Sequence, residues 1–246
     1  MRRIRLILAY DGTDYSGWQD QPGVQTVQKT IEDALAGILG VRVRVQAAGR
    51  TDAGVHALAM PAVFDDPTLI PMRAFVDGLN SRLPRDIAVQ EAAMVADDFK
   101  VIGDALSKTY RYMVYMPRLR NPHYRRTSWH VPYPLDFQKM ERAAQQFVGV
   151  HDFAAFRGQN CTAATTVRRI DGVKLQMEPP LLAIEVTGGG FLKNMVRIMV
   201  GTLIDIGRGR LHENCIRDLL DEPNRCKAGV TAPPQGLCLV SVVYDK

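Results

Sequence analysis

Residues 49–54, Gly-Arg-Thr-Asp-Ala-Gly, combine one carboxylate and one guanidinium in a stretch of small side chains. His56 follows four positions after Asp52. Glycines allow a bulky substrate to approach the backbone closely, and the neighbouring Arg50 favours the charged form of the Asp52 carboxylate. An ionised aspartate held out of the core on a turn is suited to attack an electrophilic carbon, so Asp52 is a candidate nucleophile or base.

A simpler interpretation of the same residues is a turn aspartate that caps its own backbone, with Arg50 as a solvated neighbour. The loop contains no second carboxylate, so the acid/base pair of a glycosidase is not supported. His56 can be a proton shuttle or a structural hydrogen-bonding residue, and the sequence leaves its role open.

The elements that must position this loop follow the order β-α-β-β-α-β, which is typical of a ferredoxin-like fold. Hydrophobic periodicity and the breaking residues predict a strand at 3–10, a helix from Thr26 to Gly40, strands at 41–49 and 58–64, a helix starting near Pro71, and a strand at 86–95. The Asp52 loop therefore lies just beyond the end of a strand.

The second half of the chain repeats this mixture. It predicts a long aromatic strand at 107–116, a helix at 136–148, strands around 165–177 and 181–187, helices at 191–206 and 212–221, and a final strand at 237–244. We expect an α+β protein of two ferredoxin-like units, residues 1–104 and 105–246, that share a mainly antiparallel sheet.

Two further segments carry polar groups in patterns that could bind a ligand. Tyr110 and Tyr112 lie two positions apart on the aromatic strand and therefore share one face, which suits either stacking on a planar ring or packing in a core. Three glycines precede the helix at 191–206, where free amides can bind an anion. Lys193 and Arg197 lie four positions apart on that helix, as on an ordinary solvated basic face.

Composition limits the class of protein. Of 246 residues, 46% are hydrophobic and 23% charged, as in soluble globular proteins, and the net charge of +5 permits an anionic partner. Four cysteines without a CxxC pair and five scattered histidines argue against a metal site. With no apolar run near the roughly 20 residues that span a bilayer and no signal-like N-terminus, we expect a cytoplasmic protein with reduced thiols and no membrane association.

The stretch "AGRTDAGVHA" resembles the catalytic motif of the TruA family of tRNA pseudouridine synthases. Four further segments resemble the same family in the same order: "YDGTDYSGWQDQPGVQTVQKTIEDAL", "SKTYRY", "GGGFLKNMVRIMVGTLIDIGRG" and "APPQGLCLVSVVY". The resemblance covers essentially the whole chain and is weaker over residues 60–100 and 115–160.

The resemblance implies an isomerase that converts uridines 38–40 of the tRNA anticodon stem-loop to pseudouridine without a cofactor. Asp52 would be the nucleophile, acting at C6, at C1′ or first on the 2′ proton, and Arg197 would pair with it in the active site. Tyr110 would stack on the flipped base or relay a proton, and we assign Arg50 to substrate binding. The family also implies a homodimer, and a catalytic cleft between the two units, which would be RRM-like.

A tRNA-modifying enzyme needs cations that track phosphates. We assign Lys108, Lys193, Arg208 and Arg210 to this role; weaker candidates are Arg3, Arg5, Arg111, Arg168, Arg169 and residues 125–130. The loop at 11–25, with the exposed-looking Tyr15 and Trp18, is either a mobile finger that touches RNA or a segment packed by Trp18.

Two other classes of protein are weighed against this enzyme. The first is a non-catalytic RRM-like RNA-binding protein, which would carry RNP aromatics that are absent here. The second is an aspartate-dependent hydrolase of nucleosides or sugars, which would need a water-activating partner that the sequence does not show. The sequence leaves open which tRNAs are substrates, how several uridines are reached and whether the dimer is obligatory.

Overall fold

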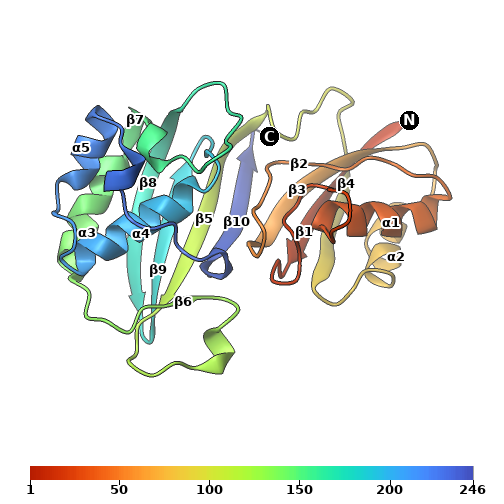
Figure 1. Ribbon diagram of the computed structural model, residues 1–246. Coiled ribbons are helices and arrows are strands. Elements are labelled where there is room, and N and C mark those ends of the chain that lie inside the picture. The colour runs from red at the N-terminus through yellow and green to blue at the C-terminus, as the bar shows by residue number, and fades with distance from the viewer. Residues whose placement is uncertain (246) are drawn as a thin grey trace. The chain divides into compact units, whose positions relative to one another are not determined.

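The chain folds into two compact units in the computed structural model, which describes residues 1–245 (Figure 1). The first unit comprises Met1–Leu106 and also the last strand from Cys238 onward, and the second comprises Ser107–Leu237. Both contain helices and strands, and the strand pairs are mainly antiparallel, so the predicted α+β class is confirmed. The predicted boundary near residue 104 leaves the last strand with the second unit, whereas its contacts group it with the first.

In the first unit, β1 lies between β4 and β3 and runs antiparallel to both, while β10 runs parallel to β3. Strand β2 also pairs with β3. Up to β4 the elements follow the predicted β-α-β-β-α-β order. The bounds are β1 (Arg2–Tyr10), α1 (Val27–Leu39), β2 (Gln46–Ala47), β3 (His56–Asp66), α2 (Asp77–Asn80), β4 (Ile87–Val95) and β10 (Leu237–Tyr244).

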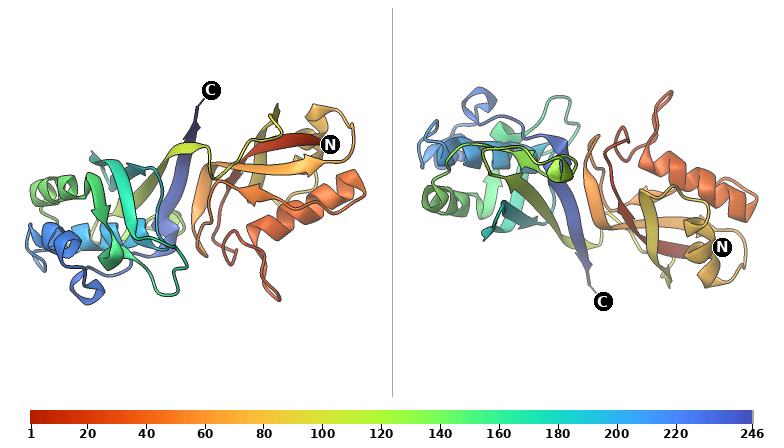
Figure 2. Two further views of the ribbon diagram at one scale, coloured as in Figure 1. Left: turned by 90° about the horizontal axis from the view of Figure 1, so that it is seen from above. Right: turned by 90° about the horizontal axis from the view of Figure 1, so that it is seen from below.

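Helix α1 covers one face of this sheet (Figure 2). Its N-cap Thr26 accepts a hydrogen bond from the backbone N–H of Lys29, and Gly40 ends it with a positive φ of 70°. Apolar residues three or four positions apart on α1 are buried, as are alternate residues of β1. The buried residues are Val27, Ile31 and Leu35 of α1 and Ile4, Leu6 and Leu8 of β1.

The strand predicted at 41–49 is wrong for most of its length, because only Gln46–Ala47 pair as a strand. Side chains of α1 take the backbone hydrogen bonds that a neighbouring strand would otherwise supply. The Val45 N–H donates to Glu32 Oε1 (2.9 Å), and the Val45 carbonyl accepts from Gln28 Nε2 (3.1 Å). Glu32 and Gln28 are themselves hydrogen-bonded and buried, so the segment is tied to the helix instead of to a sheet.

Two predicted helices are shorter than expected. The helix near Pro71 consists of a 3-10 turn at Met72–Phe75 and one α-turn, α2, whose Asn80 side chain bonds both backbone groups of Val89. The helix at 191–206 begins only at Met195, because Asn194 has a left-handed φ of 60°. Residues 191–194 therefore form a turn before that helix.

The second unit contains an antiparallel sheet in the order β5-β9-β8-β7, and the short β6 pairs with β5 in parallel. Its helices lie on one face of this sheet (Figure 2). The bounds are β5 (Ala105–Tyr115), β6 (Trp129–His130), α3 (Phe137–Ala144), β7 (Gly149–Asp152), β8 (Val167–Glu178), β9 (Leu181–Gly188), α4 (Met195–Gly207) and α5 (Cys215–Asp221).

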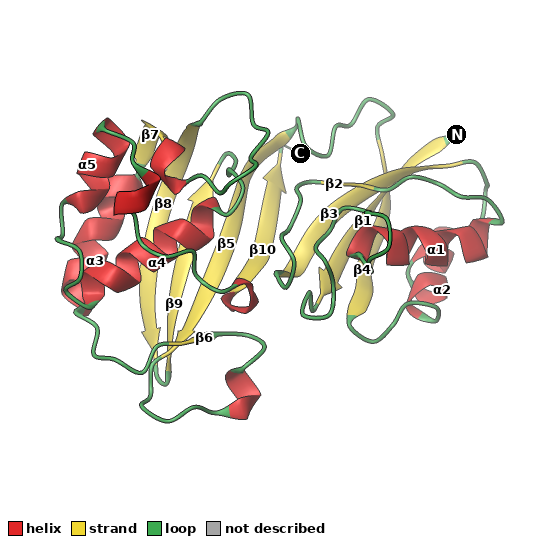
Figure 3. Ribbon diagram, in the orientation of Figure 1, coloured by secondary structure: helices red, strands yellow, loops and turns green. Residues whose placement is uncertain are grey.

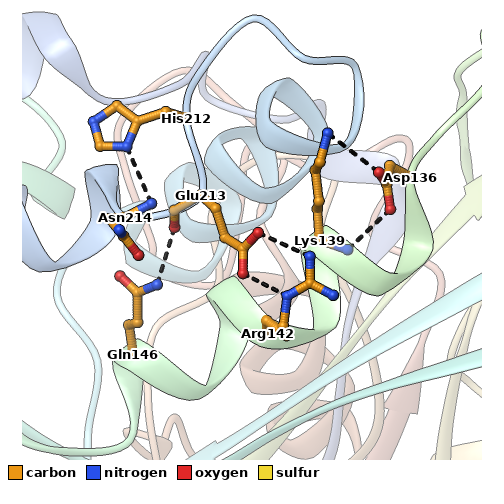
Figure 4. Close-up of polar contacts among 7 residues, drawn as sticks. All are labelled: Asp136, Lys139, Arg142, Gln146, His212, Glu213 and Asn214. Carbon is orange, nitrogen blue, oxygen red and sulfur yellow. Dashed lines mark hydrogen bonds and ion pairs between the residues drawn. The ribbon is translucent and has the colours of Figure 1, made fainter.

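Polar contacts join α3 to the segment between α4 and α5 (Figure 4). The guanidinium of Arg142 donates from Nε to Glu213 Oε1 (2.6 Å) and from Nη2 to Glu213 Oε2 (2.9 Å). Gln146 donates to the Glu213 carbonyl (2.9 Å) and accepts from the backbone N–H of Arg217 (3.0 Å). Arg142 of α3 is thereby bonded to the loop before α5, and Gln146, in the 3-10 turn Gln145–Phe147 that follows α3, is bonded to that loop and to α5.

Within residues 1–245, no helix combines the length and apolar character needed to cross a membrane. The four cysteines are free thiols. The described part of the chain also contains no group of three or more His, Cys, Asp or Glu side chains placed to share a metal ion.

Candidate active site

Asp52 lies in a tight turn immediately before β3. The Val55 N–H donates to the Asp52 carbonyl (3.1 Å), and Gly54 adopts a positive φ of 77° that closes the turn. The Asp52 side chain is half-buried, and Arg50 is exposed on the same loop. The structure thus places Asp52 on a turn, as the sequence predicted, and its side chain is partly buried; the roles of Asp52 and Arg50 stay predictions.

The loop that follows β1 braces the Asp52 turn through backbone and side-chain hydrogen bonds. Trp18 N–H donates to the Thr51 carbonyl (3.0 Å), and Gly54 N–H donates to the Tyr15 carbonyl (3.3 Å). The Tyr10 hydroxyl and Thr51 Oγ1 are 2.9 Å apart in a buried hydrogen bond. Residues 51 and 54 are therefore held on both sides of Asp52.

Two glycines make this close approach of the loops possible. A Cβ on Gly12 would lie 2.7 Å from the carbonyl carbon of Val55 and closer still to its oxygen. A Cβ on Gly17, which has a φ of 90°, would lie 2.7 Å from the Thr51 carbonyl oxygen. The motif "DGTDYSGW" therefore supplies glycine where the backbones touch. These glycines are visible in the sequence, but the periodicity of the residues could not show that they lie against the Asp52 turn.

The aromatic residues of this loop are buried, so the expectation that Tyr15 and Trp18 are exposed is wrong. Each is only 3% exposed. The Trp18 ring packs 6.2 Å from that of Tyr10, and the Tyr15 hydroxyl donates to Asp86 Oδ1 (2.7 Å). Burial and the hydrogen bond to Asp86 raise the pKa of Tyr15 well above its ordinary value, which keeps its hydroxyl protonated as a donor. The aromatic side chains anchor the loop.

His56 lies behind the turn and has a structural contact. Its side chain is buried, and Nδ1 lies 3.1 Å both from the Gly12 N–H and from Asp11 Oδ1. His56 thereby fixes the first residue of β3 to the loop after β1, as the structural interpretation of this histidine expects.

Tyr110 lies on β5 with its ring edge against Phe191, at a centroid distance of 5.2 Å and an interplanar angle of 86°. Only 8% of Tyr110 is exposed. Lys108 is on the same face of the strand and half-buried, and burial lowers the pKa of its ammonium group. Lys108 is thus a less solvated cation than the other predicted phosphate contacts.

Arg197 projects from the first turns of α4 and is half-buried. Its Nε donates to the Ala232 carbonyl (2.7 Å), and the Ala232 N–H donates back to the Arg197 carbonyl (3.1 Å). The next carbonyl, that of Pro233, accepts from the Tyr112 hydroxyl (2.7 Å). Burial raises the pKa of Tyr112 and the Arg197 guanidinium opposes that rise, so the two groups interact. Arg197 is therefore not on a solvated basic face.

The structure places the remaining predicted RNA contacts at opposite ends of α4. Lys193 is exposed two residues before the helix, and Arg208 and Arg210 follow its last residue. A rise of 1.5 Å per residue separates the two groups by about 20 Å. Arg208 stacks on the Tyr133 ring at 4.0 Å, and Arg210 pairs with Asp205 at 3.6 Å. A single phosphate therefore cannot bridge these residues.

A family model described as "tRNA pseudouridine synthase" matches residues 6–102 and 143–245. Asp52 lies in the first matched segment and Arg197 in the second, whereas Tyr110 lies between them. The chain belongs to this family. The resemblance stated from the sequence is thereby confirmed, and with it the class of enzyme, an isomerase that converts uridine to pseudouridine.

Curated relatives match over nearly the full length of both chains. The "tRNA pseudouridine synthase A" of Pelobacter propionicus is 54% identical over 99% of this chain and 100% of its own. The proteins of the same name from Geotalea uraniireducens and Geotalea daltonii are 51% and 50% identical over the same shares. Among solved structures, a chain of a Cbf5-Nop10-Gar1 complex gives a TM-score of 0.39 at 10% identity over 96% of this chain and 57% of that chain. That score is too low to carry an argument.

Proposed function

We propose that this protein isomerises uridines 38–40 in the anticodon stem-loop of tRNA, with Asp52 as the nucleophile. The observation that carries the proposal is the position of Asp52 within a member of this family. The carboxylate is half-buried on a turn whose flanking residues are tied to a second loop at Thr51, Gly54 and His56. A turn aspartate that only capped its own backbone would not need such bracing.

The reaction moves one bond and needs no oxidant or reductant. The bond between N1 of uracil and C1′ of ribose breaks, a bond between C5 and C1′ forms, C5 loses its proton and N1 gains one. A side chain that holds the detached base or the sugar for one step is therefore sufficient, and a carboxylate is suited to this role. Attack at C6, attack at C1′ and initial removal of the 2′ proton are all compatible with these atoms.

We further propose that Tyr110 and Arg197 act in the same reaction, and that Arg50 binds the substrate. The nearly buried Tyr110 ring is held edge-on by Phe191, which favours a fixed stacking surface over a mobile one. Arg197 keeps its guanidinium oriented through the Ala232 carbonyl. In this assignment the residues before Leu106 supply the nucleophile, and those after it supply the aromatic and the guanidinium. We propose that the enzyme is a cytoplasmic homodimer.

The test measures tritium release from tRNA labelled at C5 of uracil, under single-turnover conditions with saturating enzyme. Asp52→Asn keeps the size of the side chain and removes its nucleophilic charge, so we expect the rate to fall by about 10⁴-fold or more. Affinity for tRNA should change only a few-fold. Tritium release by the Asp52→Asn variant at the wild-type rate would show that Asp52 is not the nucleophile. If the wild-type chain released no tritium from any tRNA, only an RNA-binding role would remain.

The partners of Asp52 are tested by double-mutant cycles. If Arg197→Lys and Tyr110→Phe act through the same transition state as Asp52, their effects will not add to that of Asp52→Asn. Fully additive losses would assign Arg197 and Tyr110 to folding or to binding alone.

A further inference from the structure

The positive charge of the chain is concentrated in one continuous segment. Residues 105–135 contain six Lys or Arg and no Asp or Glu, which gives a formal charge of +6. The rest of the chain contains 25 basic and 26 acidic residues, which gives −1. The net charge of +5 therefore depends on this segment alone.

Four of these six cations lie on the connection between β5 and β6. We call residues 117–130 the arginine lobe. Figure 3 shows it as a loop with one short helical turn beyond the end of β5. That turn is the 3-10 helix Pro122–Tyr124. The four arginines precede and follow it, and all four are exposed: Arg118, Arg120, Arg125 and Arg126.

The arginine lobe is ordered by aromatic stacking at its base. The Tyr124 ring stacks on Tyr115 of β5 at 4.9 Å and 22°, and the His130 ring lies 5.5 Å from Tyr115. His130 Nε2 is 2.8 Å from the Pro117 carbonyl, which ties the two ends of the lobe together. The buried Ser128 donates to the Tyr124 carbonyl (2.9 Å). The arginines therefore project from a fixed scaffold.

Most other candidate phosphate contacts are paired with a carboxylate of their own surface, which offsets their charge toward an anionic ligand. The pairs are Arg3 with Asp65, Arg5 with Glu91, Arg111 with Glu185, Arg169 with Asp171, and Arg210 with Asp205. No carboxylate occurs in the sequence between Asp104 and Asp136. Four exposed arginines within nine residues and no acidic residue in the same stretch of sequence give the arginine lobe a high local density of positive charge.

We propose that the arginine lobe binds the phosphate backbone of the RNA substrate and takes no part in the chemistry. Guanidinium groups suit this role because each can donate two parallel hydrogen bonds to a phosphate. Contacts of this kind fix the position of the RNA without reading its bases. The choice of RNA as the polyanion rests on the proposed function.

The expected effect follows from counterion release. Neutralising four phosphates gives a slope of about −3 to −4 in the logarithm of the binding constant against the logarithm of the salt concentration. Between about 50 and 200 mM salt, affinity for tRNA should therefore fall about 50- to 150-fold more for the wild-type chain than for a chain without the four arginines.

The experiment compares wild type with the variant Arg118→Gln, Arg120→Gln, Arg125→Gln, Arg126→Gln. Binding to unmodified tRNA is measured across that salt range. We expect a slope shallower by about 3 and weaker binding at low salt. At low enzyme concentration the variant should release tritium more slowly, in proportion to its weaker binding, and raising the enzyme to saturation should recover the release. Replacing the same four residues with lysine should restore most of the salt slope.

A charge-matched control removes four exposed cations that are not among the predicted RNA contacts. Three of them, Arg42, Lys139 and Arg142, are paired with carboxylates, and the fourth is Lys174 of β8; each is replaced by Gln. Net charge falls by the same amount, so a slope change equal to that of the lobe variant would overturn the proposal. Tighter binding of the wild-type lobe to phosphatidylserine vesicles, with tRNA binding unchanged by the four substitutions, would also overturn it.

The outcome is separable from that of the proposed function. Asp52→Asn should abolish tritium release and leave the salt slope unchanged, whereas the lobe variant should do the reverse. If the wild-type chain binds tRNA with a salt slope that depends on the lobe but never releases tritium, the proposed isomerase activity is refuted and phosphate binding by the lobe is supported. If the chain isomerises tRNA and the salt slope of tRNA binding does not depend on the four arginines, only the proposed role of the lobe is refuted.

Discussion

Replacing Gly12 with alanine tests whether the contact between two loops positions Asp52. The added Cβ would lie 2.7 Å from the Val55 carbonyl carbon, whereas carbon atoms in contact are about 3.5–4.0 Å apart. The two loops must therefore separate by about 1 Å. Val55 is hydrogen-bonded to the Asp52 carbonyl, so the shift passes directly to the turn.

A misplacement of about 1 Å in a catalytic group can reduce the rate about 100-fold. We expect that loss in single-turnover tritium release at saturating tRNA, with affinity for tRNA changed little. Overpacking should lower the free energy of unfolding by about 1–3 kcal/mol, which urea denaturation measures. Rates are compared at a temperature where circular dichroism shows both proteins folded.

The matched control is Gly172→Ala in β8, where an added Cβ meets nothing within 4 Å. It should leave the rate within about twofold of wild type. A folded Gly12→Ala protein with the wild-type rate would refute the reasoning, because the turn would then tolerate displacement of its brace. Equal losses in both variants would point to a general effect of the substitution.

Three further predictions concern stability. Asp66→Ala leaves the part-buried Arg2 without its 2.7 Å partner, and we expect urea denaturation to show a loss of about 3 kcal/mol. Burial alone raises the pKa of Asp66, but hydrogen bonds from the next turn and from Arg2 outweigh it and hold that pKa below its usual value. The contribution of Asp66 to the free energy of unfolding should therefore be present above about pH 3.9 and be lost as pH falls below that value. The Asp66→Ala variant should not show this decline. Burial raises the pKa of Tyr244 to about 12, so its contribution to the free energy of unfolding is present below about pH 10 and is lost as pH rises toward 12. Tyr244→Phe should remove this decline from a plot of the free energy of unfolding against pH, and a decline that persists in the variant would contradict the assignment. Gly236→Ala places a Cβ 2.5 Å from the Tyr112 ring and should cost about 2 kcal/mol in thermal or urea unfolding, a loss that Tyr112→Leu in the same chain should reduce.

Local sequence determined the elements whose signals are complete within a few residues. Helix α1 shows this, because its Thr26 cap, its apolar spacing and its terminal Gly40 all lie in one stretch, and its bounds match the prediction closely. The motif around Asp52 likewise identified a family, because the turn and its neighbours are contiguous in sequence. The alternation on β5 correctly placed Tyr110 and Tyr112 on one buried face.

The tertiary structure decided whatever depended on a distant partner. Periodicity predicted a strand at 41–49, but Gln28 and Glu32 of α1 take the hydrogen bonds of Val45. Trp18 looked exposed because its polar neighbours in sequence do not reveal that its ring packs near Tyr10 and its backbone bonds to Thr51. A hydrogen bond or a contact between residues far apart in the chain leaves no periodic trace in either segment, so only the folded chain reveals what holds Asp52 in place.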